Sequence, residues 1–218
     1  MKVEYLGHSC FRFTESTDAS IVTDPYDSRV GYAMPKGVKS DIVTVSHKHK
    51  DHSFISGVKA KAVVDEEGKF NVEGVKINGI KSYHDDEGGA KRGENIIFKF
   101  RMDGIEVCHL GDLGEECTSE LLEMILPVNI LCIPVGGNYT IDAEQAKEYV
   151  DRIMPDVVIP MHYRSKKCKY DIDKEDKFLA LFDKDEIVEC EEGEMQFERD
   201  EMDGESTKVI VMQRKENL

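Results

Sequence analysis

Short apolar stretches separated by polar turns dominate the first half of the chain. Residues 2–5, 10–14 and 20–23 are rich in β-branched and aromatic side chains, with Gly, Ser and Asp between them, and predict a three-stranded meander. The Asp103-Gly104 pair is a strong signal for a hairpin turn. The same pattern predicts further strands at 42–45, 62–64, 69–72, 75–77, 80–83, 95–102 and 105–108.

The second half alternates helices with continuously apolar strands. Residues 142–154 carry apolar side chains at helical spacing and predict the clearest helix. Helices are also predicted at 118–126, which Pro127 ends, at 174–182, and directly after Ser53. Strands are predicted at 129–134, 156–160, 187–190, 195–199 and 208–213. Because β-rich and helix-containing segments follow each other twice, the order indicates two similar halves folded on each other.

Polar side chains of the kind that binds metals follow five of the predicted strands. Pro25 cannot donate to a β-ladder, so Asp24 lies at the end of its strand. The other strand ends carry the 47–52 segment, His84, Asp112 and His162. Since loops along one edge of a sheet commonly build a site, we expect these groups to meet.

The densest of these groups is Ser46-His47-Lys48-His49-Lys50-Asp51-His52. Side chains two residues apart on an extended backbone share a face, so His47 and His49 can converge on one ion. Asp51 and His52 follow in a tight corner and can face a second ion. Imidazole and carboxylate together suit zinc, with iron and manganese as competitors. The segment therefore predicts a metal site rather than a solvated polar loop.

Length and composition limit the class of protein. The 218 residues contain no apolar run of transmembrane length, and we expect one domain over residues 1–218 with no membrane partner. The first residues contain no apolar segment like that of a signal peptide, and the six cysteines form no C-x-x-C pair. A cytoplasmic location is therefore predicted, whereas the sequence does not decide between a monomer and a homo-oligomer.

The net charge of −15 argues against long nucleic acid as a partner, because a phosphate backbone would be repelled. A local basic groove around Lys166, Lys167 and Lys169 would overturn this expectation. The acidic run 189–203 is most simply a solvated surface.

Seven short segments carry a family resemblance. They are Gly7-His-Ser-Cys-Phe11, Thr23-Asp-Pro25, residues 46–52, Tyr83-His84, His109-Leu-Gly-Asp-Leu-Gly114, Pro134-Val-Gly-Gly-Asn-Tyr139 and Pro160-Met-His-Tyr163. In these residues and their order the chain resembles the metallo-β-lactamase fold superfamily, in particular its small metal-dependent hydrolases similar to the ascorbate-phosphate lactonase. The likeness covers roughly three quarters of the chain.

The resemblance implies an α/β (α+β) fold, a four-layer αββα sandwich of two mixed β-sheets with helices on both outer faces. It also implies two divalent ions, zinc in the first place and manganese or iron as alternatives. A hydroxide between the ions would be the nucleophile, because metal coordination acidifies water. The family's ligands correspond to His47, His49 and His84 for the first ion, Asp51, His52 and His162 for the second, and Asp112 as the bridge.

Three further residues have open roles. His109 is an alternative to His84 as a ligand of the first ion, and otherwise a hydrogen-bond donor or general acid; with Asp51 and Asp112 it completes the expected catalytic set. Asp24 matches the family's early aspartate, which orients a ligand histidine. His8 matches the first motif at the mouth of the site and is placed with Asp24 among the residues around the ligands, although a lone histidine in a strand turn is most often structural.

The predicted function is hydrolysis of a lactone, ester or phosphodiester bond in a small, anionic metabolite. Candidates for substrate binding are Asn138, Tyr163, Arg92 and Arg164, although such residues are equally common on any surface. The alternatives are a nuclease or phosphodiesterase acting on nucleic acid and a metal-binding module without turnover. The residues do not identify the substrate, because specificity lies in loops.

Overall fold

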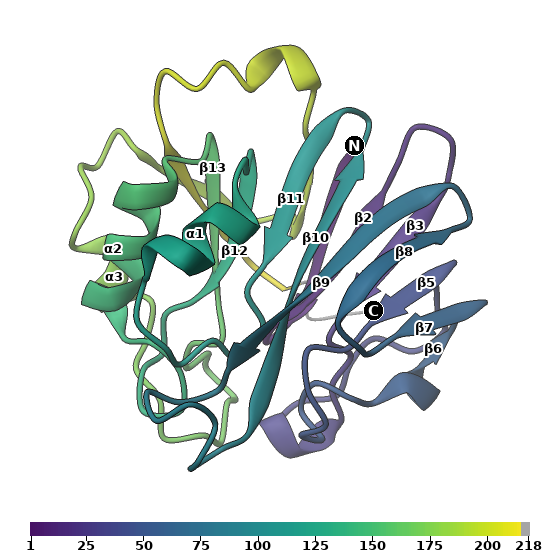
Figure 1. Ribbon diagram of the computed structural model, residues 1–218, viewed down its shortest axis with the longest axis horizontal. Helices are drawn as coiled ribbons and strands as arrows, with labels where there is room; N and C mark the ends of the chain where they lie inside the picture. The colour runs from purple at the N-terminus through teal and green to yellow at the C-terminus, as the bar shows by residue number, and fades with distance from the viewer. Residues whose placement is uncertain (215–218) are drawn as a thin grey trace.

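Two β-sheets face each other in the computed structural model, which describes residues 1–214 (Figure 1). The six-stranded sheet contains β1 (Lys2–Gly7), β2 (Cys10–Thr14), β3 (Ser20–Thr23), β5 (Ile42–Thr44), β7 (Ala62–Val64) and β15 (Glu194–Gln196). The eight-stranded sheet contains β8 (Gly68–Val72), β9 (Val75–Tyr83), β10 (Glu94–Met102), β11 (Ile105–His109), β12 (Ile130–Pro134), β13 (Val157–Met161), β14 (Ile187–Cys190) and β16 (Lys208–Met212).

Both sheets are mixed and follow the same plan. In the order β15-β1-β2-β3-β5-β7 the first four strands are antiparallel neighbours, and β5 and β7 add in parallel. In the order β14-β16-β13-β12-β11-β10-β9-β8 the strands β8 to β11 are antiparallel and the remainder parallel. The six-stranded sheet comes from residues 2–64 together with β15, which crosses over from the C-terminal part of the chain, and the other strands between residues 68 and 212 build the eight-stranded sheet.

The main core lies between the sheets. Alternate residues of each strand point inward, so Phe11 and Phe13 of β2 meet Phe98 and Phe100 of β10 in one buried cluster. The Phe13 and Phe100 rings pack edge to face with centroids 5.0 Å apart. This contact fixes one sheet on the other and therefore the relative positions of their loops.

The outer layers differ from each other. The helices α1 (Ser119–Ile125), α2 (Ala143–Ile153) and α3 (Asp176–Leu179) pack on the eight-stranded sheet (Figure 1). The six-stranded sheet is covered by single 3-10 turns, η1 (Ser28–Val30) and η2 (Ile55–Gly57), and by a small sheet of β4 (Val38–Lys39) and β6 (Val58–Lys59).

Helices were expected on both outer faces; within residues 1–214, the outer face of the six-stranded sheet carries no α-helix and is covered by the two 3-10 turns and the small sheet. The helix predicted after Ser53 is limited to η2, because the Ser53 hydroxyl donates back to the carbonyl of His49 at 2.8 Å instead of accepting from a helix N–H. Strands predicted at 75–77 and 80–83 are one strand. The chain does not turn at Gly79, which lies between them inside the strand. Glycine is needed there because a Cβ would lie 2.5 Å from the carbonyl oxygen of Glu66.

Asp103 joins the turn between β10 and β11 to the N-terminal sheet. Its carboxylate accepts from the Ser16 amide at 2.8 Å and hydroxyl at 2.5 Å, and lies 3.1 Å from the amino group of Met1. Although burial alone would raise the pKa of Asp103, these partners hold it below its usual range. The charged form is therefore favoured in the folded state.

We expect Asp103→Asn to lower the free energy of unfolding by about 1 kcal/mol at neutral pH. Because the folded-state pKa is depressed, this contribution is present above the unfolded pKa of about 4 and is lost as the pH falls through the lower folded value. Urea denaturation of both proteins from pH 7 to pH 3 measures the difference, with Asp18→Asn in the exposed neighbouring turn as the control. A difference that stays constant down to pH 3 would contradict this account.

Candidate metal centre

The turns that follow β3, β5, β9, β11 and β13 meet at one edge of the sandwich, as do their predicted site residues. Thr23 pairs with Thr44 in parallel register, so Asp24 and the 46–52 segment leave the sheet side by side. The Asp24 amide donates to the carbonyl of Thr44 at 2.9 Å. In the described chain, ligand-type atoms within 4.8 Å of one another form three groups: His47, His49 and His84; His8, Asp51, His52 and His162; and His47, His52 and Asp112.

The first group brings together three histidines from two loops. The centroid of the His47 ring lies 4.6 Å from that of His49 and 4.8 Å from that of His84. His47 and His84 are buried, whereas His49 is exposed at the edge of the site. His47 and His49 converge as the i, i+2 spacing predicts, and the third nitrogen comes from His84, not from His109.

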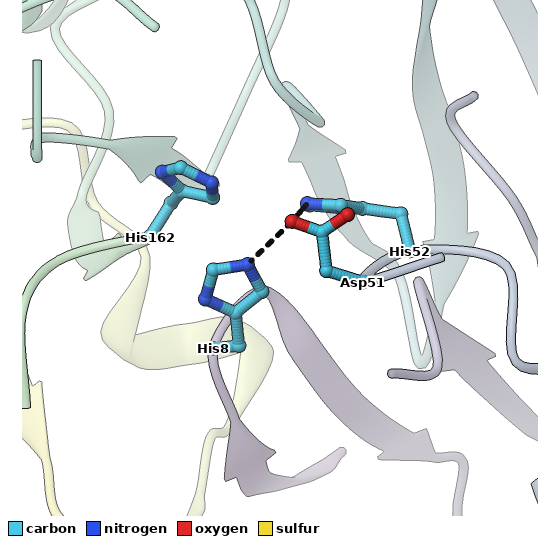
Figure 2. A group of neighbouring side chains, drawn as sticks. All are labelled: His8, Asp51, His52 and His162. Carbon is cyan, nitrogen blue, oxygen red and sulfur yellow. Dashed lines mark ion pairs between the residues drawn. The ribbon is translucent and has the colours of Figure 1, made fainter. Parts of the chain in front are cut away.

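The second group joins three loops and is shown in Figure 2. Nε2 of His52 lies 3.9 Å from Oδ2 of Asp51, and Nε2 of His8 lies 3.6 Å from the same oxygen. The ring of His162 completes the group, with its centroid 4.4 Å from that of His8. Three of the four members were predicted to share an ion, and His8 joins them directly.

Asp112 lies between the two groups. Its Oδ2 is 3.7 Å from Nε2 of His47 and 3.3 Å from Nε2 of both His84 and His162, and its Oδ1 is 3.1 Å from Nε2 of His52. Among residues 1–214, Oδ1 of Asp112 and Nε2 of His47 and of His52 are buried without a hydrogen-bond partner.

The buried atoms without hydrogen-bond partners show whether metal ions would fit the site. A buried polar atom without a partner is costly and calls for an unseen group. Two ligands of one tetrahedral zinc ion lie about 3.3 Å apart, which matches the observed spacing better than hydrogen bonds do. The donor set of imidazole nitrogens and carboxylate oxygens suits zinc, manganese or iron. The residues therefore fit divalent ions.

The protonation states of the site also favour cations. Burial, with His52 nearby, lowers the pKa of His47 to about 3, and burial also lowers the pKa of His84, so both rings are neutral at pH 7. Burial alone would raise the pKa of Asp112, but His162 and His52 hold it well below the usual range. Neutral imidazoles and ionised carboxylates are the forms that bind metal. Burial opposes the charge of His52, yet the neighbouring carboxylates of Asp112 and Asp24 raise its pKa, and a cation held by the Asp112 carboxylate would displace this proton.

Asp24 lies behind histidines of both groups, which is the arrangement that its expected supporting role requires. It is fully buried, accepts from the Ser46 amide at 2.7 Å and hydroxyl at 2.6 Å, and lies 2.9 Å from Nδ1 of His52. The Ser46 hydroxyl is also 2.9 Å from Nδ1 of His47. One carboxylate thus fixes the ring positions of His52 directly and of His47 through Ser46.

His109 has no ring nitrogen left for an ion or for proton transfer. Its Nε2 lies 2.8 Å from the carbonyl oxygen of Ser9, and its Nδ1 accepts from the Gly111 amide at 3.2 Å. The ring is fully buried and lies outside the three groups of the described chain. His109 therefore holds the 109–112 turn against β2, and we do not retain it as a catalytic residue or as an alternative to His84.

Two of the four substrate-binding candidates meet near the site. The Arg92 guanidinium donates to the carbonyl of Asn138 at 2.9 Å and lies over the Tyr139 ring, 5.6 Å from its centroid. The side-chain amide of Asn138 donates to the carbonyl of Asp171, so this side chain links two loops instead of facing a ligand. Arg92 remains a candidate.

The other two candidates lie elsewhere. Tyr163 is buried in a cavity that it shares with Tyr5 and Tyr32. Arg164 is exposed, and its backbone amide donates to the carbonyl of Asp173. These two positions do not join the metal groups.

Sequence reasoning missed three residues. Ser46 supports His47, and the Asn95 side chain accepts from the Asp112 amide at 2.9 Å. The ring of Tyr170 lies 5.8 Å from that of His8, and burial together with Asp51 raises its pKa. The position of Ser46 directly before His47 could have indicated its supporting role. No sequence feature indicates the roles of Asn95 and Tyr170, since each is a single polar residue far along the chain from the ligands that it meets.

Known proteins resemble this chain in sequence and in structure. The family model described as "Beta-lactamase superfamily domain" matches residues 2–162. A UPF0173 metal-dependent hydrolase of Thermococcus onnurineus is 26% identical over 223 residues, covering 89% of this chain and 98% of the relative. Another from Pelotomaculum thermopropionicum is 30% identical, covering 76% and 85%.

A solved structure has the same fold over nearly its whole length. It is a Thermotoga maritima protein described as a candidate Zn-dependent hydrolase of the metallo-beta-lactamase superfamily. The identity is 37% and the TM-score 0.81, over 98% of this chain and 99% of that one. The mixed sandwich described above is thus shared with that structure.

Proposed function

The chain belongs to the beta-lactamase superfamily and is a metal-dependent hydrolase, and we propose that it uses two divalent ions, zinc in the first place. The bond that it hydrolyses is a lactone, ester or phosphodiester bond in a small, anionic metabolite. The relatives are described as metal-dependent hydrolases, which supports the reaction class. The number of ions and the substrate class are our proposals.

The proposal of two ions rests on Asp112. Its two oxygens lie 3.1 to 3.7 Å from Nε2 atoms of four histidines that belong to both groups. A single ion does not account for seven donors spread over two groups. We assign His47, His49 and His84 to the first ion, Asp51, His52 and His162 to the second, and Asp112 to both.

The protein's own contribution is to position charge. When bound, the ions acidify water and stabilise the negative charge that develops on the substrate. Asp24 and Ser46 hold the rings of His52 and His47 so that no reorganisation is needed during the reaction. Asp112 supplies a negative charge shared by both groups, which allows two cations to lie close together.

Arg92 supports an anionic substrate. Aromatic rings connect the second metal group with Arg92. The centroid of the Tyr170 ring lies 5.8 Å from that of His8 and 6.3 Å from that of Tyr139, and Arg92 lies over the Tyr139 ring. The Arg92 guanidinium would be able to pair with a carboxylate or phosphate group of a substrate that extends from the metal groups toward Tyr139.

A nuclease is less well supported. Lys166 and Lys167 line a cavity together with Tyr32, Tyr163 and Glu175, so the charge there is mixed. The Tyr32 hydroxyl in that cavity accepts from the backbone amide of His8, whereas the His8 ring faces the metal groups. Lys166 and Lys167 therefore do not line a uniformly basic groove of the kind that a phosphate backbone would follow.

Metal analysis combined with a substrate panel tests the function. We expect purified protein to contain about two zinc ions per chain and to hydrolyse one class among lactones, aryl esters and aryl phosphodiesters, with activity lost on chelation and restored by zinc or manganese. Cleavage of oligonucleotides alone would favour the nuclease. Full metal content without turnover of any substrate would favour a metal-binding module.

A further inference from the structure

His8 is a buried histidine in the turn between β1 and β2, and its ring has no hydrogen-bond partner in the described part of the chain. Neither Nδ1 nor Nε2 has a hydrogen-bond partner, although only 1% of the residue is exposed, and the contact of Nε2 with Asp51 is an ion pair at 3.6 Å. On the basis of the proposed function, we propose that His8 is a ligand of the second ion. That ion would then have five protein ligands, with Asp51, His52, His162 and Asp112, whereas the first ion has four.

The direction of the ring supports this assignment. Figure 2 shows the His8 ring pointing at Asp51, with His52 and His162 around the same space. Nε2 of His8 is 3.6 Å from Oδ2 of Asp51, which is too long for a hydrogen bond and close to the separation of two ligands on one ion. Its ligand atom lies within 4.8 Å of those of the other three residues.

The backbone holds His8 in this position against its own preference. Its φ of 57° is in the left-handed region, which residues other than glycine rarely adopt. The Tyr5 hydroxyl donates to the His8 carbonyl at 3.1 Å, and the His8 amide donates to the Tyr32 hydroxyl at 3.1 Å. Contacts that hold a strained conformation are typical of functional positions.

His109 provides the comparison within the same molecule. It is as deeply buried as His8, but both of its nitrogens are hydrogen bonded to backbone groups. A histidine that serves only the core is satisfied in this way. His8 lacks such partners, and a metal ion beside Asp51 would supply one. The consequence is two unequal sites, with five protein ligands for the second ion and four for the first.

The variant His8→Gly tests the assignment without straining the backbone, because glycine adopts a positive φ readily. We expect the affinity for one of the two zinc ions to fall by about 100-fold or more, above the 10- to 100-fold loss typical of a residue that only orients a ligand. At a buffered zinc concentration that saturates both sites of the unaltered protein, the variant should retain about one ion. Added imidazole should restore the second ion by entering the vacated space.

Two controls separate a ligand from a structural residue. Tyr170→Phe removes a hydroxyl next to His8 and Asp51 but no grouped ligand atom, and should retain both ions. Circular dichroism and thermal unfolding without metal establish that His8→Gly is folded. If His8→Gly does not fold, the unaltered protein loaded with cobalt is studied by NMR instead. Six of its seven histidines should then give hyperfine-shifted imidazole signals, and only five such signals would overturn the assignment.

The outcomes for His8 and for the proposed function are distinct. If His8→Gly binds two ions with unchanged affinity, or if imidazole has no effect on a variant that has lost one, His8 is not a ligand and the two-ion hydrolase still stands. If the unaltered protein itself binds fewer than two ions under saturating zinc, the proposed two-ion centre is wrong.

Discussion

Replacing Asp112 by asparagine is expected to reduce kcat/KM by about 10³-fold or more and to release at least one of the two ions. The change keeps the size of the side chain but removes the negative charge that four Nε2 atoms face at 3.1 to 3.7 Å. Two cations would then repel each other without a shared anion. Elemental analysis and steady-state kinetics on the active substrate of the panel measure both effects.

Asp200→Asn is the matched control for Asp112→Asn. Asp200 is exposed in the 3-10 turn η3 (Arg199–Glu201), far in sequence from any grouped residue, and should leave metal content and rate unchanged. An Asp112→Asn protein that keeps two ions and more than a tenth of the activity would show that the bridge is misassigned.

Asp24→Asn is expected to have the second largest effect, on stability and on metal affinity together. The metal-free protein should lose about 3–5 kcal/mol of unfolding free energy, because a buried charged partner of His52 is removed at 2.9 Å. The affinity for metal should fall roughly 10- to 100-fold, since both His52 and His47 lose their support. Denaturant unfolding and competition with a chromophoric chelator provide the two measurements.

The backbone does not confound the Asp24 experiment. Asp24 has a φ of 40°, a region that asparagine tolerates almost as well as aspartate. Asp27→Asn, at a position three residues further along and outside the metal groups of the described chain, serves as the control. Loss of stability without loss of metal affinity would mean that Asp24 supports the fold and not the ligands.

The local part of the site was predictable because its information is local. The i, i+2 spacing of His47 and His49 on an extended backbone fixes their convergence, and the strand ends fix where Asp24, Asp112 and His162 leave the sheets. The fold class followed from the order of motifs, and the comparisons confirm it. Neither inference needed knowledge of how distant segments pack.

The remainder depends on distant packing. The motif around His8 places it at the mouth of the site, but His8 and Asp51 are 43 positions apart, and the sequence does not indicate that the His8 ring meets Asp51 directly. For the same reason His109 was expected in the site, although Ser9 and Gly111 occupy its nitrogens. A helix was predicted after Ser53 because a serine before an apolar run resembles a cap, and sequence alone does not reveal that its hydroxyl is bonded elsewhere.

The acidic run 189–203 has a consequence for how the folded protein avoids aggregation. β14 and β15 lie at the outer edges of the eight-stranded and six-stranded sheets, and the run places Glu189 in the first and Glu194 in the second. An edge strand offers unpaired backbone groups to the edges of other molecules. Glu189 is exposed, and its negative charge opposes pairing of the β14 edge with the β14 edge of a second copy, so this end of the eight-stranded sheet is protected from extension by the same edge of another molecule.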